Sequence, residues 1–177
     1  MPILTIEQEE INIPRNLALL DTNVLVARFD QRDRLHPEAR LILDEDNRFW
    51  WLVISPVVVE AAGMLMKRQG EKSVLSMLRW LITPGTRTFL LTCLEGPREL
   101  EKQIPGLADL IAKRRIDYVD AHLMRAASIL TDICALAPHS TPIVTGDGRD
   151  FFSGSGFGYR YSLLDLRDPG GEVIRIC

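Results

Sequence analysis

Short apolar runs alternate with longer amphipathic stretches along the chain. Runs such as Leu17–Leu20 and 49–54 are bounded by polar residues and predict buried strands. The stretches between them repeat apolar residues at helical spacing, which predicts helices. This alternation favours an α/β fold in which helices pack on a mostly parallel sheet. We expect strands at 17–20, 49–54, 87–92, 142–144 and 159–164, an edge strand at 173–176, and helices at 23–29, 37–43, 56–69, 74–82 and 119–136.

Prolines, glycines and a serine mark the expected ends of helices. Ser55 predicts an N-cap, and Pro56 suits the first position of the helix that follows. Pro105 and Gly106 interrupt the polar stretch that starts at Pro97. We therefore expect two short helices between residues 97 and 114 rather than one.

Composition agrees with one folded domain over residues 1–177, with its core at about 17–152. The ends are a polar N-terminal extension (1–16) and a glycine-rich tail (153–177). Apolar residues make up 46% of the 177 and the formal net charge is -3, which excludes a disordered chain and a surface that is cationic throughout. No apolar run reaches the roughly 20 residues of a membrane helix, and the acidic start does not read as a signal peptide. Three scattered cysteines form no C-x-x-C pair, so we expect a cytoplasmic protein that does not bind membranes.

Several carboxylates fall where predicted strands end or helices begin. Asp21 and Asp147 follow strands, Glu60 lies early in a helix, and Asp120 begins the long helix. The carboxyl ends of parallel strands share one edge of a sheet, so these acids are expected to approach one another. Such a cluster stays ionised most readily around Mg²⁺ or Mn²⁺, whose bound water can attack phosphorus. In the alternative interpretation, Asp117, Asp120 and Asp147 only cap helices and turns.

Four segments appear in a fixed order between residues 17 and 152. They are Asp21-Thr22-Asn23-Val24-Leu25-Val26 after an apolar run, Ile54-Ser55-Pro56 with Glu60 downstream, Asp120-Ala121-His122-Leu123-Met124-Arg125-Ala126-Ala127, and Ile143-Val144-Thr145-Gly146-Asp147-Gly148-Arg149-Asp150-Phe151. This order resembles the PIN-domain ribonucleases, particularly the single-domain VapC-type toxins. The resemblance implies a three-layer α/β/α sandwich and metal-dependent cleavage of RNA phosphodiester bonds.

The resemblance also implies roles for particular residues. It assigns catalysis and the binding of one or two Mg²⁺ or Mn²⁺ ions to Asp21, Glu60, Asp120 and Asp147, with Asp150 as a further candidate ligand. Asn23, Thr145 and Asp117 would hold these carboxylates in place, and Asp117 is also a candidate N-cap.

Basic residues near the acids are candidates for contact with RNA. Lys113, Arg114 and Arg115 could instead form a solvated helix end, where cations complement the helix dipole. The full set is Arg28, Arg149, Lys113, Arg114 and Arg115.

The leading hypothesis is a metal-dependent endoribonuclease, which as a toxin would be a homodimer blocked by an antitoxin protein. The chain departs from small VapC-type toxins by its N-terminal extension, by extra sequence between residues 70 and 115, and by its tail. One alternative is a catalytically silent PIN-like domain that binds RNA or protein. Another is phosphotransfer through an aspartyl-phosphate at Asp21, although Asp21-Thr22-Asn23 lacks the second Asp of a D-x-D arrangement. Three dispersed histidines disfavour a zinc site or a Ser-His-Asp triad.

Overall fold

A six-stranded sheet forms the centre of the computed structural model, which describes residues 3–6, 9–14, 16–91, 97–114, 116–133, 141–153, 161–168 and 170–176. Its strands stand in the order β5-β4-β3-β6-β7-β8. All neighbouring strands are parallel except β8, which pairs antiparallel with β7 at one edge. The mostly parallel sheet predicted from the sequence is therefore confirmed. The strands are β3 (Leu17–Leu20), β4 (Trp50–Ile54), β5 (Thr88–Leu91), β6 (Pro142–Thr145), β7 (Tyr161–Asp165) and β8 (Ile174–Ile176).

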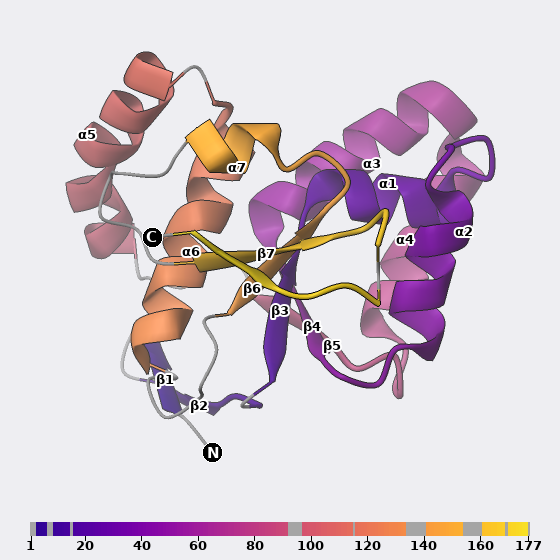
Figure 1. Cartoon of the computed structure of the whole chain (residues 1–177), viewed down its shortest axis with the longest axis horizontal. Helices are drawn as coiled ribbons and strands as arrows, with labels where there is room; N and C mark the ends of the chain where they lie inside the picture. Colours follow the sequence, from indigo (N-terminus) through magenta and orange to yellow (C-terminus); the bar gives the residue numbers. More distant parts are fainter. Residues whose placement is uncertain are drawn as a thin grey trace.

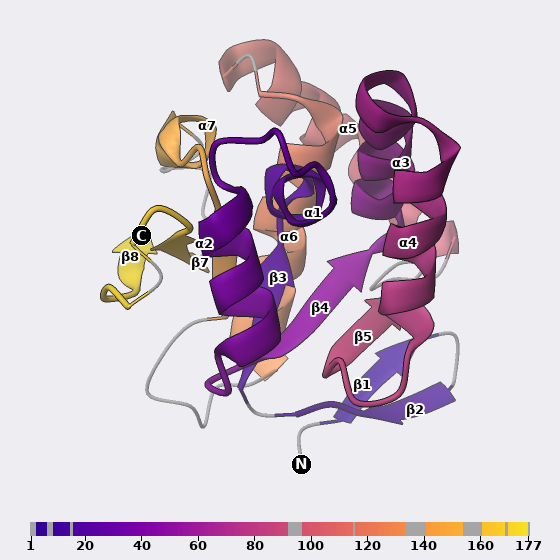
Figure 2. The ribbon, with the colours of Figure 1, turned by 90° about the vertical axis from the view of Figure 1, so that its right-hand side faces the viewer.

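Helices cover both faces of this sheet. Figure 1 shows α1 to α4 on one side of the strands and α5 to α7 on the other, which gives the three layers of an α/β/α sandwich. Figure 2 shows α1 and α2 in front of the strands and α6 behind them. The helices are α1 (Thr22–Phe29), α2 (His36–Arg40), a turn of wider π-helix η1 (Leu41–Glu45), α3 (Ser55–Gln69), α4 (Glu71–Ile82), α5 (Pro97–Arg114), α6 (Tyr118–Ile133) and α7 (Arg149–Ser153).

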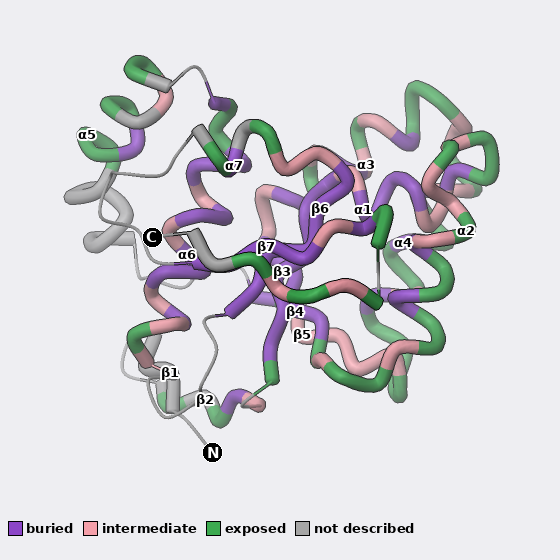
Figure 3. Tube along the Cα trace, in the orientation of Figure 1, coloured by how far each residue is buried: buried purple, intermediate pink, exposed green. Residues whose placement is uncertain are grey.

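Strand β3 occupies the middle of the sheet and explains where the candidate site forms. All four of its residues are buried, because helices cover both faces of the sheet, and in Figure 3 the trace of β3 and of its neighbours is coloured mostly as buried. It pairs with β4 on one side and with β6 on the other, so the order of strands along the chain reverses at β3. Ligands of open α/β sheets bind at the carboxyl ends of the strands beside such a reversal. Residues that follow β3 and β6 are therefore placed together there.

Two expectations about helix ends are wrong. Helix α5 runs without a break from Pro97 to Arg114, with Pro105 inside it. Leu107 is buried and Ile111, one turn later, packs against the core, and this packing offsets the cost of an internal proline. Ser55 is not an N-cap: Ile54 holds that position in an extended conformation and has no capping side-chain hydrogen bond, because β4 leads directly into α3.

The N-terminal extension forms a hairpin that the sequence did not predict. Strands β1 (Ile3–Ile6) and β2 (Glu9–Asn12) pair antiparallel, with Leu4 opposite Ile11. In Figures 1 and 2 the hairpin lies at the end of the sheet from which β3 starts, away from the carboxyl edge. The predicted end of the helix at 134–136, the glycines of 154–160 and all three cysteines lie outside the described residues. Within the described part of the chain, no helix combines the length and apolar character needed to cross a membrane.

Candidate active site

Asp21 lies at the turn from β3 into α1. Its backbone is extended (φ -78°, ψ 157°), and its N–H donates to the carbonyl of Val144 in β6 at 3.1 Å. Its side chain caps α1, because Oδ1 accepts a hydrogen bond from the N–H of Thr22 at 2.5 Å. The residue is 5% exposed. The junction of strand and helix therefore holds a carboxylate at the carboxyl edge of the sheet, almost out of contact with bulk water.

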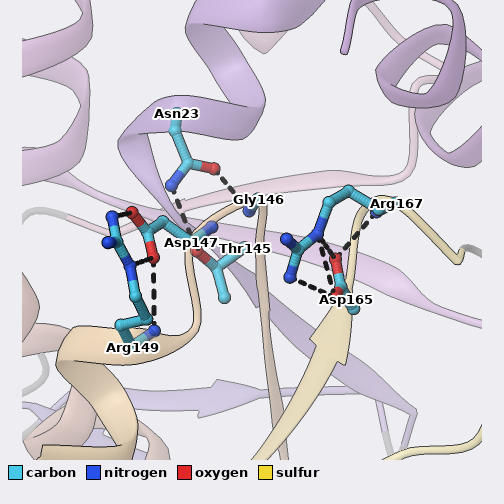
Figure 4. Close-up of polar contacts among 7 residues, drawn as sticks. All are labelled: Asn23, Thr145, Gly146, Asp147, Arg149, Asp165 and Arg167. Atoms are coloured by element: carbon cyan, nitrogen blue, oxygen red, sulfur yellow. Dashed lines mark hydrogen bonds and ion pairs between the residues drawn. The ribbon is translucent and has the colours of Figure 1, made fainter.

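Two polar side chains hold the other oxygen of Asp21. Asn23 Nδ2 and Thr145 Oγ1 donate to Asp21 Oδ2 at 2.5 and 2.6 Å. Asn23 also donates to Thr145 Oγ1 at 3.1 Å, and its own Oδ1 accepts from the N–H of Gly146 at 2.8 Å (Figure 4). A Cβ at Gly146 would lie 3.3 Å from that Asn23 oxygen and 2.6 Å from Leu35 Cδ1, so glycine permits this close approach. The orientation of Asp21 is therefore fixed from both α1 and β6.

Burial raises the pKa of Asp21 from 3.8 to about 7. Hydrogen bonds from Thr145 and Thr22 counteract the shift, whereas the charges of Asp117 and Glu60 add to it. Those two carboxylates are therefore near enough to repel Asp21. A bound cation would stabilise the ionised form of this group.

Glu60 reaches the site from the second turn of α3. Thr22 Oγ1 donates to Glu60 Oε2 at 2.6 Å, while the N–H of the same threonine donates to Asp21. Thr22 itself is buried, at 5% exposure. One threonine thus joins two of the sequence-predicted carboxylates, although 38 residues separate Thr22 from Glu60.

The two acids at the start of α6 have different surroundings. Asp117 is the N-cap, because its Oδ1 accepts from the N–H of Asp120 at 2.8 Å and its carbonyl from the N–H of Ala121 at 3.2 Å. Asp120 is 8% exposed and lies near Tyr161 of β7. Burial first, and then the charge of Asp120, raises the pKa of Tyr161 to about 12. The capping interpretation thus holds for Asp117, whose negative charge also raises the pKa of Asp21.

The backbone of Asp147 is hydrogen-bonded to the site, but its carboxylate is hydrogen-bonded to Arg149. Its N–H donates to Thr145 Oγ1 at 3.0 Å. Arg149 Nε and Nη2 donate to its two carboxylate oxygens at 2.9 and 2.6 Å (Figure 4). These hydrogen bonds are the largest of the effects that lower the pKa of Asp147 to about 2.

The structure thus brings Asp21, Glu60 and Asp117 into electrostatic range and ties Asp147 to the same region through Thr145. Within the described ranges, no three carboxylate, imidazole or thiol side chains converge closely enough to hold a metal ion. Metal binding by the four predicted acids therefore stays a prediction.

The candidate RNA contacts are spread over several places. Arg28 forms an ion pair with Asp44 at 3.0 Å and is 20% exposed, and Lys113 pairs with Asp109 at 2.6 Å. Arg149 borders the site through Asp147. The side chains of Arg114 and Asp150, and all of Arg115, lie outside the described part.

Two polar residues beside the site were not predicted from the sequence. Asp165 ends β7 in register with Thr145, and Arg167 follows two residues later. Asp21 was identified because it follows a predicted strand, and the same reasoning would have identified Asp165. Thr22 was seen only as part of the Asp21-Thr22-Asn23 triplet, since its bond to Glu60 depends on the packing of α1 against α3.

Comparison with known proteins identifies the fold. No family model and no curated protein matches the chain. The structure is similar to that of VapC20 of Mycobacterium tuberculosis, a Sarcin-Ricin loop cleaving toxin. The TM-score is 0.57 at 17% sequence identity, over 80% of this chain and 95% of that chain. The fold is therefore PIN-like, as the sequence resemblance predicted.

Proposed function

We propose that this chain, with its PIN-like fold, is a ribonuclease that hydrolyses RNA phosphodiester bonds with one or two bound Mg²⁺ or Mn²⁺ ions. The observation that carries the proposal is the buried Asp21 carboxylate at the strand-order reversal, with Glu60 and Asp117 near enough to raise its pKa. The structural likeness to an RNA-cleaving toxin supports the choice of RNA as substrate.

The donor set at this edge suits a hard divalent cation. Carboxylate oxygens are the ligands that Mg²⁺ and Mn²⁺ prefer, and the repulsion at Asp21 is the kind that a cation relieves. Asp21, Glu60, Asp120 and Asp147 would hold the ions, with Asp117 contributing negative charge. When bound, the ions would lower the pKa of a water molecule and offset negative charge at phosphorus.

The residues around Asp21 have positioning roles in this proposal. Thr145 and Asn23 fix one carboxylate oxygen of Asp21, and Thr22 fixes the other while also holding Glu60. Such contacts limit the rotation of the carboxylates, so that little reorganisation accompanies substrate binding. Burial of Asp21 keeps bulk water away from its oxygens.

Partners follow from the same proposal. Single-stranded or loop RNA is the expected substrate, since exposed phosphates can enter a carboxyl-edge site. An antitoxin protein that covers the acids, a homodimer and a cytoplasmic location complete the proposed toxin assignment. Co-expression with candidate inhibitor proteins, followed by a cleavage assay of the purified complex, would test the antitoxin.

A cleavage assay tests the ribonuclease directly. Wild-type protein and Asp21→Asn, purified in parallel, would be incubated with a mixed RNA pool in Mn²⁺ or in EDTA. Cleavage by the wild type in Mn²⁺ alone is expected. Asp46→Asn, whose pair with Arg48 lies just before β4 at the amino-terminal end of the sheet, serves as an acid-to-amide control that should cleave like the wild type. Cleavage that persists in EDTA or in Asp21→Asn would refute the proposal.

A catalytically silent RNA-binding or protein-binding module is the second candidate. The observation that favours it is that Glu60 and Asp147 are each held by a partner in the chain, Thr22 and Arg149. Calorimetric titration with Mn²⁺ separates the two candidates. For the ribonuclease, Asp21→Asn should remove heat of Mn²⁺ binding that the wild type shows, whereas for a silent module the substitution should remove none. Phosphotransfer by Asp21 is disfavoured, since Asp21-Thr22-Asn23 lacks the second Asp of a D-x-D arrangement.

A further inference from the structure

Two Asp-x-Arg segments with the same local geometry lie at the ends of neighbouring strands. Asp147-Gly148-Arg149 follows β6, and Asp165-Leu166-Arg167 begins at the last residue of β7. In each, Nε of the arginine donates to Oδ1 of the aspartate at 2.9 Å and Nη2 donates to Oδ2 at 2.6 Å. The backbone N–H of each arginine also donates to Oδ1, at 3.3 Å in the first pair and 2.9 Å in the second. We call these two units the arginine pairs.

Both arginine pairs are anchored on Thr145, the residue that donates to Asp21. Thr145 Oγ1 accepts the N–H of Asp147 at 3.0 Å, and the carbonyl of Thr145 accepts the N–H of Leu166 at 2.8 Å. Asp165 stands opposite Thr145 in the sheet register. Figure 4 shows the pairs on either side of Thr145. They therefore lie at the same edge of the sheet as Asp21.

The two guanidinium groups are close enough to affect each other and are open to solvent. The side chain of Arg149 is 87% exposed and that of Arg167 is 57% exposed. Hydrogen bonds to Asp165 are the first cause of the raised pKa of Arg167. Asp147 raises that pKa further, whereas Arg149 lowers it, so both members of one pair act on the arginine of the other. Two neighbouring cations at an exposed edge favour an anion placed between them.

The forked geometry leaves the other edge of the Arg167 guanidinium able to bind a second anion, with the exposed charge of Arg149 beside it. A guanidinium has five N–H donors, and an aspartate held by Nε and Nη2 takes one edge of that plane. The outer edge matches the two oxygens of a phosphate.

We propose that Arg149 and Arg167 together bind the phosphate backbone of single-stranded RNA beside the bond that is cleaved at Asp21. This inference rests on the proposed ribonuclease function and adds Arg167 as a positioning residue for the substrate. The contact is with phosphate, so it positions the strand and does not read its sequence.

A third pair of the same geometry provides a matched control. Arg48 Nη2 donates to Asp46 Oδ2 at 2.7 Å, and the backbone N–H of Arg48 donates to Asp46 Oδ1 at 2.8 Å. This pair precedes β4, at the amino-terminal end of the sheet, whereas the substrate would lie at the carboxyl edge. Arg48→Ala thus removes the corresponding pair with Asp46, together with a contact to the Phe49 ring at 5.5 Å, without removing a predicted phosphate contact.

The test measures RNA binding separately from cleavage. A labelled single-stranded RNA is titrated with protein carrying Asp21→Asn, which leaves the RNA intact, and fluorescence anisotropy is followed over a series of KCl concentrations. Adding Arg167→Ala or Arg149→Ala is expected to weaken binding about tenfold, the effect of losing one charged hydrogen-bond contact. Each substitution should also reduce the slope of log K against log salt by about 0.7 per lost phosphate contact. Arg48→Ala should change affinity by less than about twofold.

Asp165→Asn separates a phosphate contact from a structural role. It removes the negative charge behind Arg167, so RNA affinity should rise about threefold. Unchanged or weaker binding by Asp165→Asn, with an unaltered melting temperature, would overturn the proposal. Undiminished binding by Arg149→Ala and Arg167→Ala would also overturn it, and wild-type cleavage of RNA in Mn²⁺ would then leave the nuclease function intact. If the protein neither binds nor cleaves RNA, both proposals fall.

Discussion

Replacing Asp21 with asparagine should remove a pH-dependent loss of stability. In the unfolded chain Asp21 releases its proton near its ordinary pKa of 3.8, whereas in the folded protein the pKa is about 7. Between these values the folded state binds one proton more than the unfolded state, so the free energy of unfolding decreases as the pH rises. The penalty is absent below about pH 4 and complete above about pH 7. A pKa moved from 3.8 to about 7 corresponds to about 4 kcal/mol, which is the upper limit of the effect.

Urea unfolding of the wild type and Asp21→Asn from pH 4 to pH 8, followed by circular dichroism in EDTA, measures this effect. The amide also changes the hydrogen bonds to Thr22, Asn23 and Thr145, but that contribution stays constant with pH. The stability of the wild type relative to the variant should therefore decrease by up to about 4 kcal/mol across the series. Adding Mn²⁺ at pH 8 should stabilise the wild type more than the variant.

Asp147→Asn is the matched acid control. The pKa of Asp147 is lowered to about 2 by Arg149, so this carboxylate is ionised in both states throughout most of the range. Its contribution is lost only as the pH falls through its unfolded and folded pKa values, and its difference from the wild type should be flat from pH 5 to pH 8. Parallel pH curves for the wild type and Asp21→Asn would refute the raised pKa and the crowding of acids around Asp21.

Three further substitutions test other parts of the account. Asp117→Asn keeps a capping oxygen for α6 and removes a charge that repels Asp21, so in urea it should be at least as stable as the wild type; Asp117→Ala loses the cap and should be about 1 kcal/mol less stable than Asp117→Asn, and equal stabilities of the two variants would contradict the N-cap. Thr22→Val removes the hydroxyl that holds Glu60 and should lower the RNA cleavage rate about tenfold, with a loss of about 1 kcal/mol in stability; an unchanged rate would show that this bond does not position Glu60. Pro105→Ala should raise the melting temperature, because a proline inside a helix costs up to about 3 kcal/mol; a lower melting temperature would mean that α5 needs the proline.

The fold was predictable because its strands are marked locally. Leu17–Leu20 is apolar throughout because both faces of β3 are covered. This pattern can be recognised in the sequence without knowing which strands pair with β3. Pro105 shows the limit of local reasoning. The residue does disfavour a helix, but the packing of Leu107 and Ile111 against the core outweighs that preference.

The site was predictable as a set of positions but not as a set of contacts. The rule that placed Asp21 at the end of a strand needs only the order of elements, and it would have identified Asp165 as well. The bond from Thr145 to Asp21 joins residues 124 positions apart, and nothing in the local sequence specifies it. The pairing of Asp147 with Arg149 is local, but whether that carboxylate turns to the arginine or to a metal depends on the balance of charge at the folded site.

Crystals grown with Mn²⁺ would test the central claim most directly, by anomalous diffraction at the manganese edge. We expect a peak about 2.1 Å from a carboxylate oxygen of Asp21, with Glu60, Asp120 or Asp147 binding the same ion directly or through water. A protein that cleaves RNA while its crystals show no manganese at Asp21, or show it only on distant surface acids, would contradict the account.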